Sequence, residues 1–150
     1  MLNINAVEQL SLFDLKSRSQ SKEIGQFFTE SKTADYMASM LYSIGNVELV
    51  KILDAGAGEG ILTASAARRC LEIGNRRVHA VLFEVDKDIL PALEENMDRL
   101  VRIFIKKGGK LSYEIRNEDF VLSRPDKHER SFHISIINPP YFKYNSKDSV

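Results

Sequence analysis

Short apolar runs of the kind that form buried strands recur along this chain, and each is followed by a turn signal. Helix-forming stretches separate them, with connections long enough for crossovers. The expected strands cover residues 49–53, 78–83, 111 to about 119, and 132–137. This alternation predicts an α/β fold: a parallel sheet with helices on both faces.

The expected helices follow from the 3.6-residue period of the apolar positions. One covers residues 33–44, and we expect the stripe on its apolar face to pack in the core. A second follows the glycine turn over residues 61–74. The third has Pro91 in its first turn, a position that suits proline. The first stripe is Met37, Met40, Leu41 and Ile44, and the apolar side of the third helix is Leu93, Met97, Leu100, Val101 and Phe104.

Length and composition limit the classes of function. The chain has 150 residues, 43% of them hydrophobic, which predicts one domain with a real core. The polar N-terminus predicts an arm or linker over residues 1–23 ahead of a domain at 24–150. Twenty-one basic residues balance 21 acidic ones, so the chain is not expected to hold nucleic acid by itself. No membrane span or signal peptide is evident, and we therefore expect a cytoplasmic protein.

A glycine turn after the first strand is the first candidate binding feature. Glycines at 56, 58 and 60 allow the backbone to approach a ligand closely, ahead of a helix N-terminus that favours an anionic or carboxylate-bearing group. Ile61 stands where the dinucleotide fingerprint has a small residue, so NAD fits poorly. A glycine cluster alone is equally well explained as a tight strand-to-helix turn.

Two acidic residues at later strand ends narrow the choice of cofactor. Glu84 could accept hydrogen bonds from both hydroxyls of a ribose, and Asp119 could accept from an adenine amino group. Each taken singly is also explained as an ordinary solvated carboxylate. Their register with the glycine turn favours a cofactor of the adenosine type.

The sequence Asn138-Pro139-Pro140-Tyr141, at the end of the last expected strand, is the most specific feature of the chain. The asparagine side chain and a rigid proline carbonyl can accept both protons of a planar amino group, and the tyrosine ring can stack on the attached base. A proline turn would explain the two prolines, but not the flanking asparagine and tyrosine. The histidines are scattered and no metal-ligand cluster is evident, so we expect no metal.

Together these elements resemble the S-adenosylmethionine-dependent DNA adenine-N6 methyltransferases of restriction-modification systems. The likeness covers residues 22–142 and includes Gly-Gln-Phe-Phe-Thr at 25–29, ahead of the glycine turn. This motif order is similar to the gamma arrangement of that family. The resemblance implies a Rossmann-like methyltransferase fold. That fold usually has seven strands, so with four visible it would be incomplete at its C-terminal side.

The resemblance also implies a role for individual residues. The expected cofactor-binding residues are Phe27, Thr29, Asp54, Ala55, Gly56, Gly58, Glu84, Val85, Asp119, Phe120 and Asn138, and the expected catalytic residues are Asn138, Pro139, Pro140 and Tyr141. Within the first group, Phe27 and Thr29 would close over the cofactor, and Glu84 would bind its ribose. Glu30 stands where family members often have proline, a departure that leaves the loop shape open there.

The function implied is methyl transfer from S-adenosylmethionine to the exocyclic amino group of adenine in DNA, by the N-terminal part of a larger enzyme. We expect this part to be inactive alone, to meet duplex DNA through regions mostly outside it, and to self-associate through the exposed strand at 132–137. A restriction or specificity subunit is a further expected partner. The alternatives are a protein-glutamine or RNA-base methyltransferase, and a non-catalytic module that binds cofactor or a partner.

Overall fold

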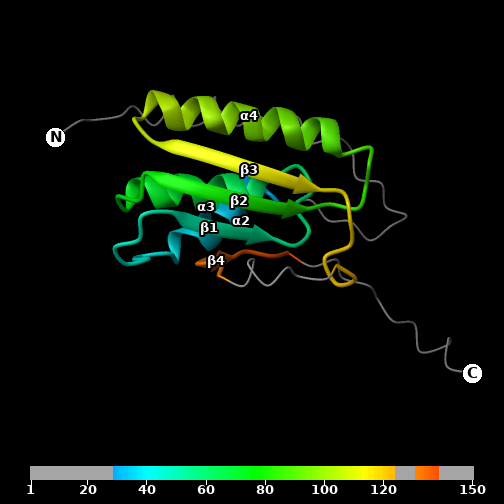
Figure 1. Cartoon of the computed structure of the whole chain (residues 1–150), viewed down its shortest axis with the longest axis horizontal. Helices are drawn as coiled ribbons and strands as arrows, with labels where there is room; N and C mark the ends of the chain where they lie inside the picture. The colour runs from blue at the N-terminus through cyan, green and yellow to red at the C-terminus, as the bar shows by residue number, and fades with distance from the viewer. Residues whose placement is uncertain (1–28, 124–130, 139–150) are drawn as a thin grey trace, which may run out of the picture. The chain divides into compact units, whose positions relative to one another are not determined.

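A parallel four-stranded sheet forms the centre of the structure (Figure 1). The computed structural model describes residues 29–123 and 131–138, which belong to a compact unit spanning Thr29–Pro139. The strand order is β3-β2-β1-β4, and all three strand pairs are parallel. The strands are β1 (Val50–Asp54), β2 (Arg77–Phe83), β3 (Lys110–Arg116) and β4 (Ile134–Ser135). The predicted parallel α/β sheet is therefore confirmed.

The two central strands explain the continuous apolar runs in the sequence. In β1 every residue except Lys51 is buried, and in β2 the run from Ala80 to Phe83 is buried without interruption. Strands of a parallel sheet that are covered on both faces lose the polar alternation of half-exposed strands. The pairing register sets Asp54 opposite Leu82, so these strands end at the same edge of the sheet.

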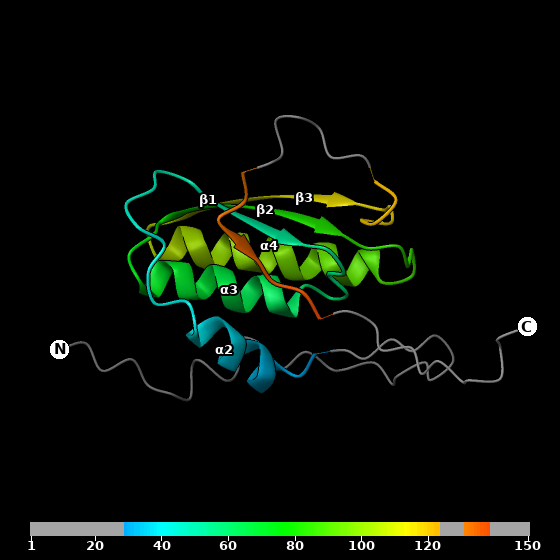
Figure 2. The ribbon, with the colours of Figure 1, turned by 90° about the horizontal axis from the view of Figure 1, so that it is seen from below.

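Three helices are described, and Figure 2 shows two of them, α3 and α4, side by side on one face of the sheet. Helix α3 (Ile61–Glu72) packs against β1 and β2, and α4 (Leu90–Lys106) packs against β3. Helix α2 (Ser31–Ser39) packs on α3, in a layer further from the sheet. Among residues 29–123 and 131–138 no helix covers the opposite face, so the helices predicted for both faces are seen on one face only.

The apolar stripe predicted for the third helix is confirmed in α4. Leu93, Met97, Leu100 and Phe104 are buried, and Val101 is half-buried. Pro91 lies in the first turn of the helix, as expected. No helix within residues 29–123 and 131–138 is long and apolar enough to cross a bilayer.

The predicted apolar stripe at 33–44 is wrong. The helix ends at Ser39, and Met40 is 57% exposed just beyond it. Its buried residues are instead Ala34 and Ala38, whose small side chains allow close approach to α3. After the helix, the carbonyl oxygen of Leu41 accepts a hydrogen bond of 2.8 Å from Nε of Arg69, which holds the chain in a non-helical path.

Two predicted strands are longer in the sequence pattern than in the structure. The third ends at Arg116 and not near Asp119. The fourth, predicted at 132–137, is reduced to Ile134–Ser135, although backbone hydrogen bonds continue on each side of it. At its start, the Lys51 amide donates to Nδ1 of His133 at 3.0 Å, so a side chain takes the place of a backbone acceptor.

The glycine turn between β1 and α3 contains two residues whose backbone requires glycine. Gly58 has φ of 54° and Gly60 has φ of 82°, both in the left-handed region. A Cβ at Gly60 would also lie 2.8 Å from Cδ1 of Leu93 on α4. Gly56 differs, because its φ is not in that region and a Cβ there would meet nothing within 4 Å.

We expect Gly60→Ala to lower the free energy of unfolding by about 1–3 kcal/mol, because alanine is strained at this φ and its methyl group displaces Leu93. Gly56→Ala is the matched control and should change it by less than about 0.5 kcal/mol, as an exposed substitution into open space. Urea unfolding followed by circular dichroism measures both. Equal stability of the two variants would show that the turn has no need of glycine at position 60.

Candidate cofactor and acceptor site

Asp54, the last residue of β1, carries a fully buried carboxyl group. Its Oδ2 accepts a hydrogen bond of 2.7 Å from the Thr63 hydroxyl on α3, and its Oδ1 accepts a longer one of 3.4 Å from the Gly56 amide. Burial raises the pKa of Asp54 to about 6, an effect that these hydrogen bonds partly oppose and that the nearby charge of Glu84 adds to. A buried acid close to a second acid attracts a positively charged group.

Glu84 follows β2 directly and is also buried. Its Oε2 accepts from the Gly58 amide and its Oε1 from the Asp86 amide, each at 2.8 Å. The first contact links the glycine turn to the end of the neighbouring strand. Each carboxylate oxygen has a second lone pair, so both can still accept from the hydroxyl groups of a ligand.

Two asparagines that the sequence analysis missed hold this edge in place. Nδ2 of Asn117 donates to the carbonyl oxygens of Glu84 at 2.8 Å and Val85 at 3.1 Å. On α4, Nδ2 of Asn96 donates to the carbonyl oxygen of Glu59 at 2.9 Å and so fixes the glycine turn. Asn96 could have been found, because it is a polar residue within the apolar stripe of its helix.

An apolar surface lies next to Glu84. The rings of Phe83 and Phe120 meet edge to face with centroids 5.1 Å apart, and Phe120 packs against the buried side chains of Leu53 and Val81. Val85 is 58% exposed, which leaves its side chain available to a flat ring. The turn after β3 therefore reaches across the ends of β1 and β2.

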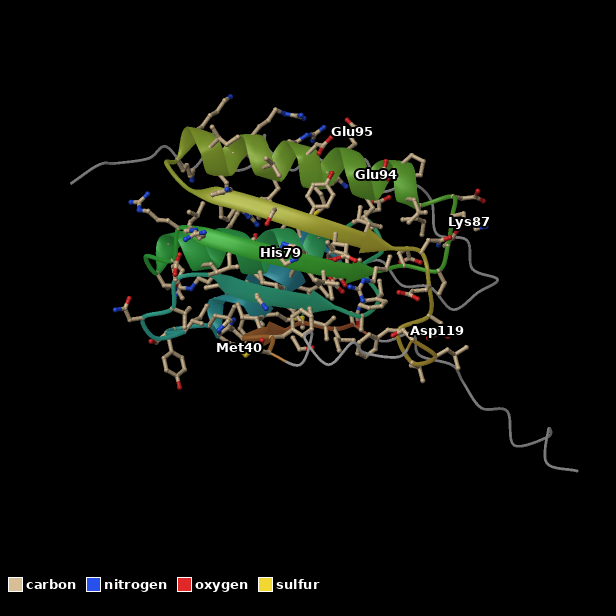
Figure 3. All side chains as sticks on the ribbon, in the orientation of Figure 1. Met40, His79, Lys87, Glu94, Glu95 and Asp119 are labelled. Atoms are coloured by element: carbon tan, nitrogen blue, oxygen red, sulfur yellow. The ribbon has the colours of Figure 1, made fainter. Side chains whose placement is uncertain are left out.

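Asp119 is exposed in this turn, beyond the carboxyl ends of the strands (Figure 3). Its Oδ1 accepts a hydrogen bond of 2.8 Å from the Val121 amide. Part of its acceptor capacity is thus used locally. The remaining lone pairs can still accept from an amino group.

The expected acceptor site is represented by one described residue, Asn138. Its Nδ2 donates a hydrogen bond of 2.9 Å to the hydroxyl of Thr29, which lies 109 positions earlier in the chain. The predicted residues Phe27, Pro139, Pro140 and Tyr141 lie outside the described residues. Through Thr29 and Asn138 the structure thus brings together the motif at 25–29 and the motif at 138–141.

The arrangement suits a cationic ligand that carries a ribose and a flat base. Asp54 supplies buried negative charge, Glu84 supplies hydroxyl acceptors, and Val85 with Phe120 supplies an apolar surface. Ala55, the residue after Asp54, is half-buried. Gly56 is exposed with open space beside it, so neither its backbone angle nor internal packing requires glycine there. In the part of the chain described, no group of three or more metal-ligating side chains is present.

Comparison with known sequences finds two type II methyltransferases, although no family model matches the chain. Type II methyltransferase M.BsuBI from Bacillus subtilis is 34% identical over 143 residues, which cover 88% of this chain. Type II methyltransferase M.PstI from Providencia stuartii is 25% identical over 150 residues, which cover 96% of it. The chain spans 26% and 29% of the lengths of these two relatives.

Solved structures with the same fold are also methyltransferases. A protein from Listeria monocytogenes assigned to the class I S-adenosylmethionine-dependent methyltransferases matches with a TM-score of 0.59 at 19% identity, over 93% of this chain and 39% of that one. A protein from Pyrococcus horikoshii assigned as an RNA methyltransferase matches with a TM-score of 0.51 at 30% identity, over 87% of this chain and 57% of that one. The fold and the homology imply the predicted cofactor, S-adenosylmethionine. This chain is therefore similar to part of two type II methyltransferases, and it has the Rossmann-like methyltransferase fold.

Proposed function

We propose that this chain forms the S-adenosylmethionine-binding part of a methyltransferase that acts on the exocyclic amino group of adenine in DNA. The observation that carries the proposal is the shared position of Asp54, Glu84 and Asn138 at the carboxyl ends of three neighbouring strands. Ligands of parallel α/β sheets bind at this edge. The sequence resemblance and the two type II relatives support DNA as the substrate.

The described residues would contact the cofactor in three places. Asp54 and the open space at Gly56 would receive the methionine part, which carries positive charge. Glu84 would accept from the ribose hydroxyls, while Val85 and Phe120 would enclose the adenine ring. When bound, the cofactor supplies an activated methyl group. The protein contributes binding, orientation and the exclusion of water.

Asn138 would hold the amino group that receives the methyl. Its side-chain oxygen can accept one proton of a planar amino group and so orient the nitrogen toward the cofactor site. Pro139 and Tyr141 would complete this site in the manner that the resemblance implies. For adenine in a duplex, the base must first be rotated out of the stack, which costs a few kcal/mol.

DNA binding would depend largely on regions outside this chain, since its basic and acidic residues balance. β4 is the edge strand of the described sheet, and we propose that it mediates self-association when these 150 residues are prepared alone. An RNA base is the second candidate substrate, favoured by the likeness to the Pyrococcus horikoshii protein. Methyl-transfer assays with duplex DNA and with RNA distinguish the two.

Glu84→Ala should weaken S-adenosylmethionine binding by at least about tenfold, because a charged acceptor contributes roughly 1.5–3 kcal/mol. Glu94→Ala is the matched control, since Glu94 is an exposed acid on α4 (Figure 3) and should leave the affinity unchanged. Titration calorimetry measures both. Because Glu84 also holds the Gly58 amide, circular dichroism must show that the variant is folded. Parental affinity in folded Glu84→Ala would remove Glu84 from the site.

Cofactor affinity should rise with pH between about 5 and 7. The pKa of Asp54 is about 6 in the free protein, and a bound cation favours its ionised form, so at lower pH binding must displace a proton. Affinity about tenfold weaker at pH 5 than at pH 7 is expected, because pH 5 lies about one unit below the pKa of Asp54 and most of the free protein then carries the protonated acid. Asp54→Asn should bind weakly with most of this slope removed. A variant that keeps the parental slope would show that another group titrates.

Asn138→Ala should lower kcat for methyl transfer by about 100-fold or more in the natural full-length protein, because the acceptor amino group loses its orienting partner. Cofactor affinity should stay within about threefold, since the amide is assigned to the acceptor. Single-turnover methyl transfer and titration calorimetry measure the two quantities. Activity within a few-fold of the parent would exclude this role for Asn138.

A further inference from the structure

The hydrogen bond between Asn138 and Thr29 joins two segments that the resemblance assigns to different tasks. Thr29 is expected to close over the cofactor, and Asn138 to hold the acceptor. In the structure the Asn138 amide nitrogen donates to the Thr29 hydroxyl at 2.9 Å, and both residues are partly buried. No other described residue forms a hydrogen bond with the Asn138 side chain.

This contact holds the Asn138 side chain in place at the edge of the sheet. An asparagine side chain has one acceptor oxygen and one donor nitrogen at nearly equivalent positions, exchanged by a half-turn about its last bond. In the structure Nδ2 is engaged by Thr29 and Oδ1 is left to accept. A hydroxyl can donate as well as accept, so the contact fixes the position of the amide group and does not decide which end faces a ligand. An amino group can be held by Oδ1, whereas Nδ2 would present donor to donor.

Thr29 is itself held in place by the start of α2. The first turn of this helix follows at once, and the Ala34 amide donates to the carbonyl oxygen of Glu30 at 3.0 Å. Helix α2 is tied to α3 by Asp35, whose carboxylate accepts from both Ser65 and Arg68. Thr29 therefore lies directly before the first turn of an anchored helix, while Asn138 follows the two-residue strand β4.

We infer that Thr29 is a positioning residue that holds the Asn138 side chain in place through this hydrogen bond, so that its amide group stays within reach of the amino group to be methylated. The inference rests on the proposed function, because it assigns Thr29 a role in presenting the acceptor. Loss of the Thr29 hydroxyl should therefore lower kcat and leave cofactor affinity nearly unchanged. The two sequence elements then act as one unit in which Thr29 works through Asn138.

The test compares Thr29→Val, which keeps the shape and removes the hydroxyl, with Thr29→Ser, which keeps the hydroxyl. In the natural full-length protein, we expect Thr29→Val to lower kcat about tenfold, the equivalent of one hydrogen bond. Thr29→Ser should stay within about twofold of the parent. Thr33→Val, at an exposed position on α2, is the matched control and should leave kcat unchanged.

A second background tests whether Thr29 acts through Asn138. In Asn138→Ala the partner of the Thr29 hydroxyl is absent, so adding Thr29→Val should change kcat by less than about twofold. Titration calorimetry with S-adenosylmethionine should give affinities within about threefold for all Thr29 variants. This measurement also shows that each variant is folded, independently of turnover.

The ways in which the experiment can fail are distinguishable. If the parent protein methylates neither adenine in DNA nor another amino group, the proposed function itself fails. If the parent is active and Thr29→Val retains its kcat, or if the same loss appears in the Asn138→Ala background, Thr29 does not act through Asn138. Weaker cofactor affinity with kcat unchanged would return Thr29 to the role of a cofactor contact and overturn the inference.

Discussion

Two carboxyl groups, those of Asp54 and Glu84, are buried at the ends of adjacent parallel strands, and the loops around them are arranged to solvate them. Removing a carboxylate from water is expensive unless hydrogen bonds or a cation compensate. Here the compensation comes from the Thr63 hydroxyl and from backbone amides of the glycine turn and of Asp86. No salt bridge among the described residues involves either acid. Folding alone does not require this pair, and a cationic ligand gives a physical reason for it.

The parts of the fold that could be predicted from the sequence depend on local periodicity. Helix α4 has one strongly apolar side, and the carboxyl-end halves of β1 and β2 are buried without interruption, so each leaves a clear pattern. The predicted stripe at Met40 failed because α2 packs on another helix through Ala34 and Ala38, and small side chains give little periodic signal. The residues that a short helix buries therefore depend on the element against which it packs.

The site was predictable to the extent that it follows from topology. Parallel strands bring their carboxyl ends together, which is why Asp54 and Glu84 could be assigned to one edge before their contacts were known. The contacts of Asn117 and the pairing of Thr29 with Asn138 could not be derived, since they join segments distant in sequence. The sequence also does not show which of the glycines in the turn are required. That depends on the backbone angle of each glycine and on the space around it.

The attachment of β4 to β1 alone has a mechanical consequence. Backbone hydrogen bonds from His133 and Ile136 to the carbonyl oxygens of Lys51 and Leu53 set the height of Asn138 above the sheet, and Asp54 is the next residue on β1. The proposed acceptor residue and the Asp54 part of the proposed donor site are therefore carried by neighbouring strands. A twist or displacement of β1 moves Asp54 and Asn138 together, so the distance between these two residues changes less than their distances to the rest of the domain.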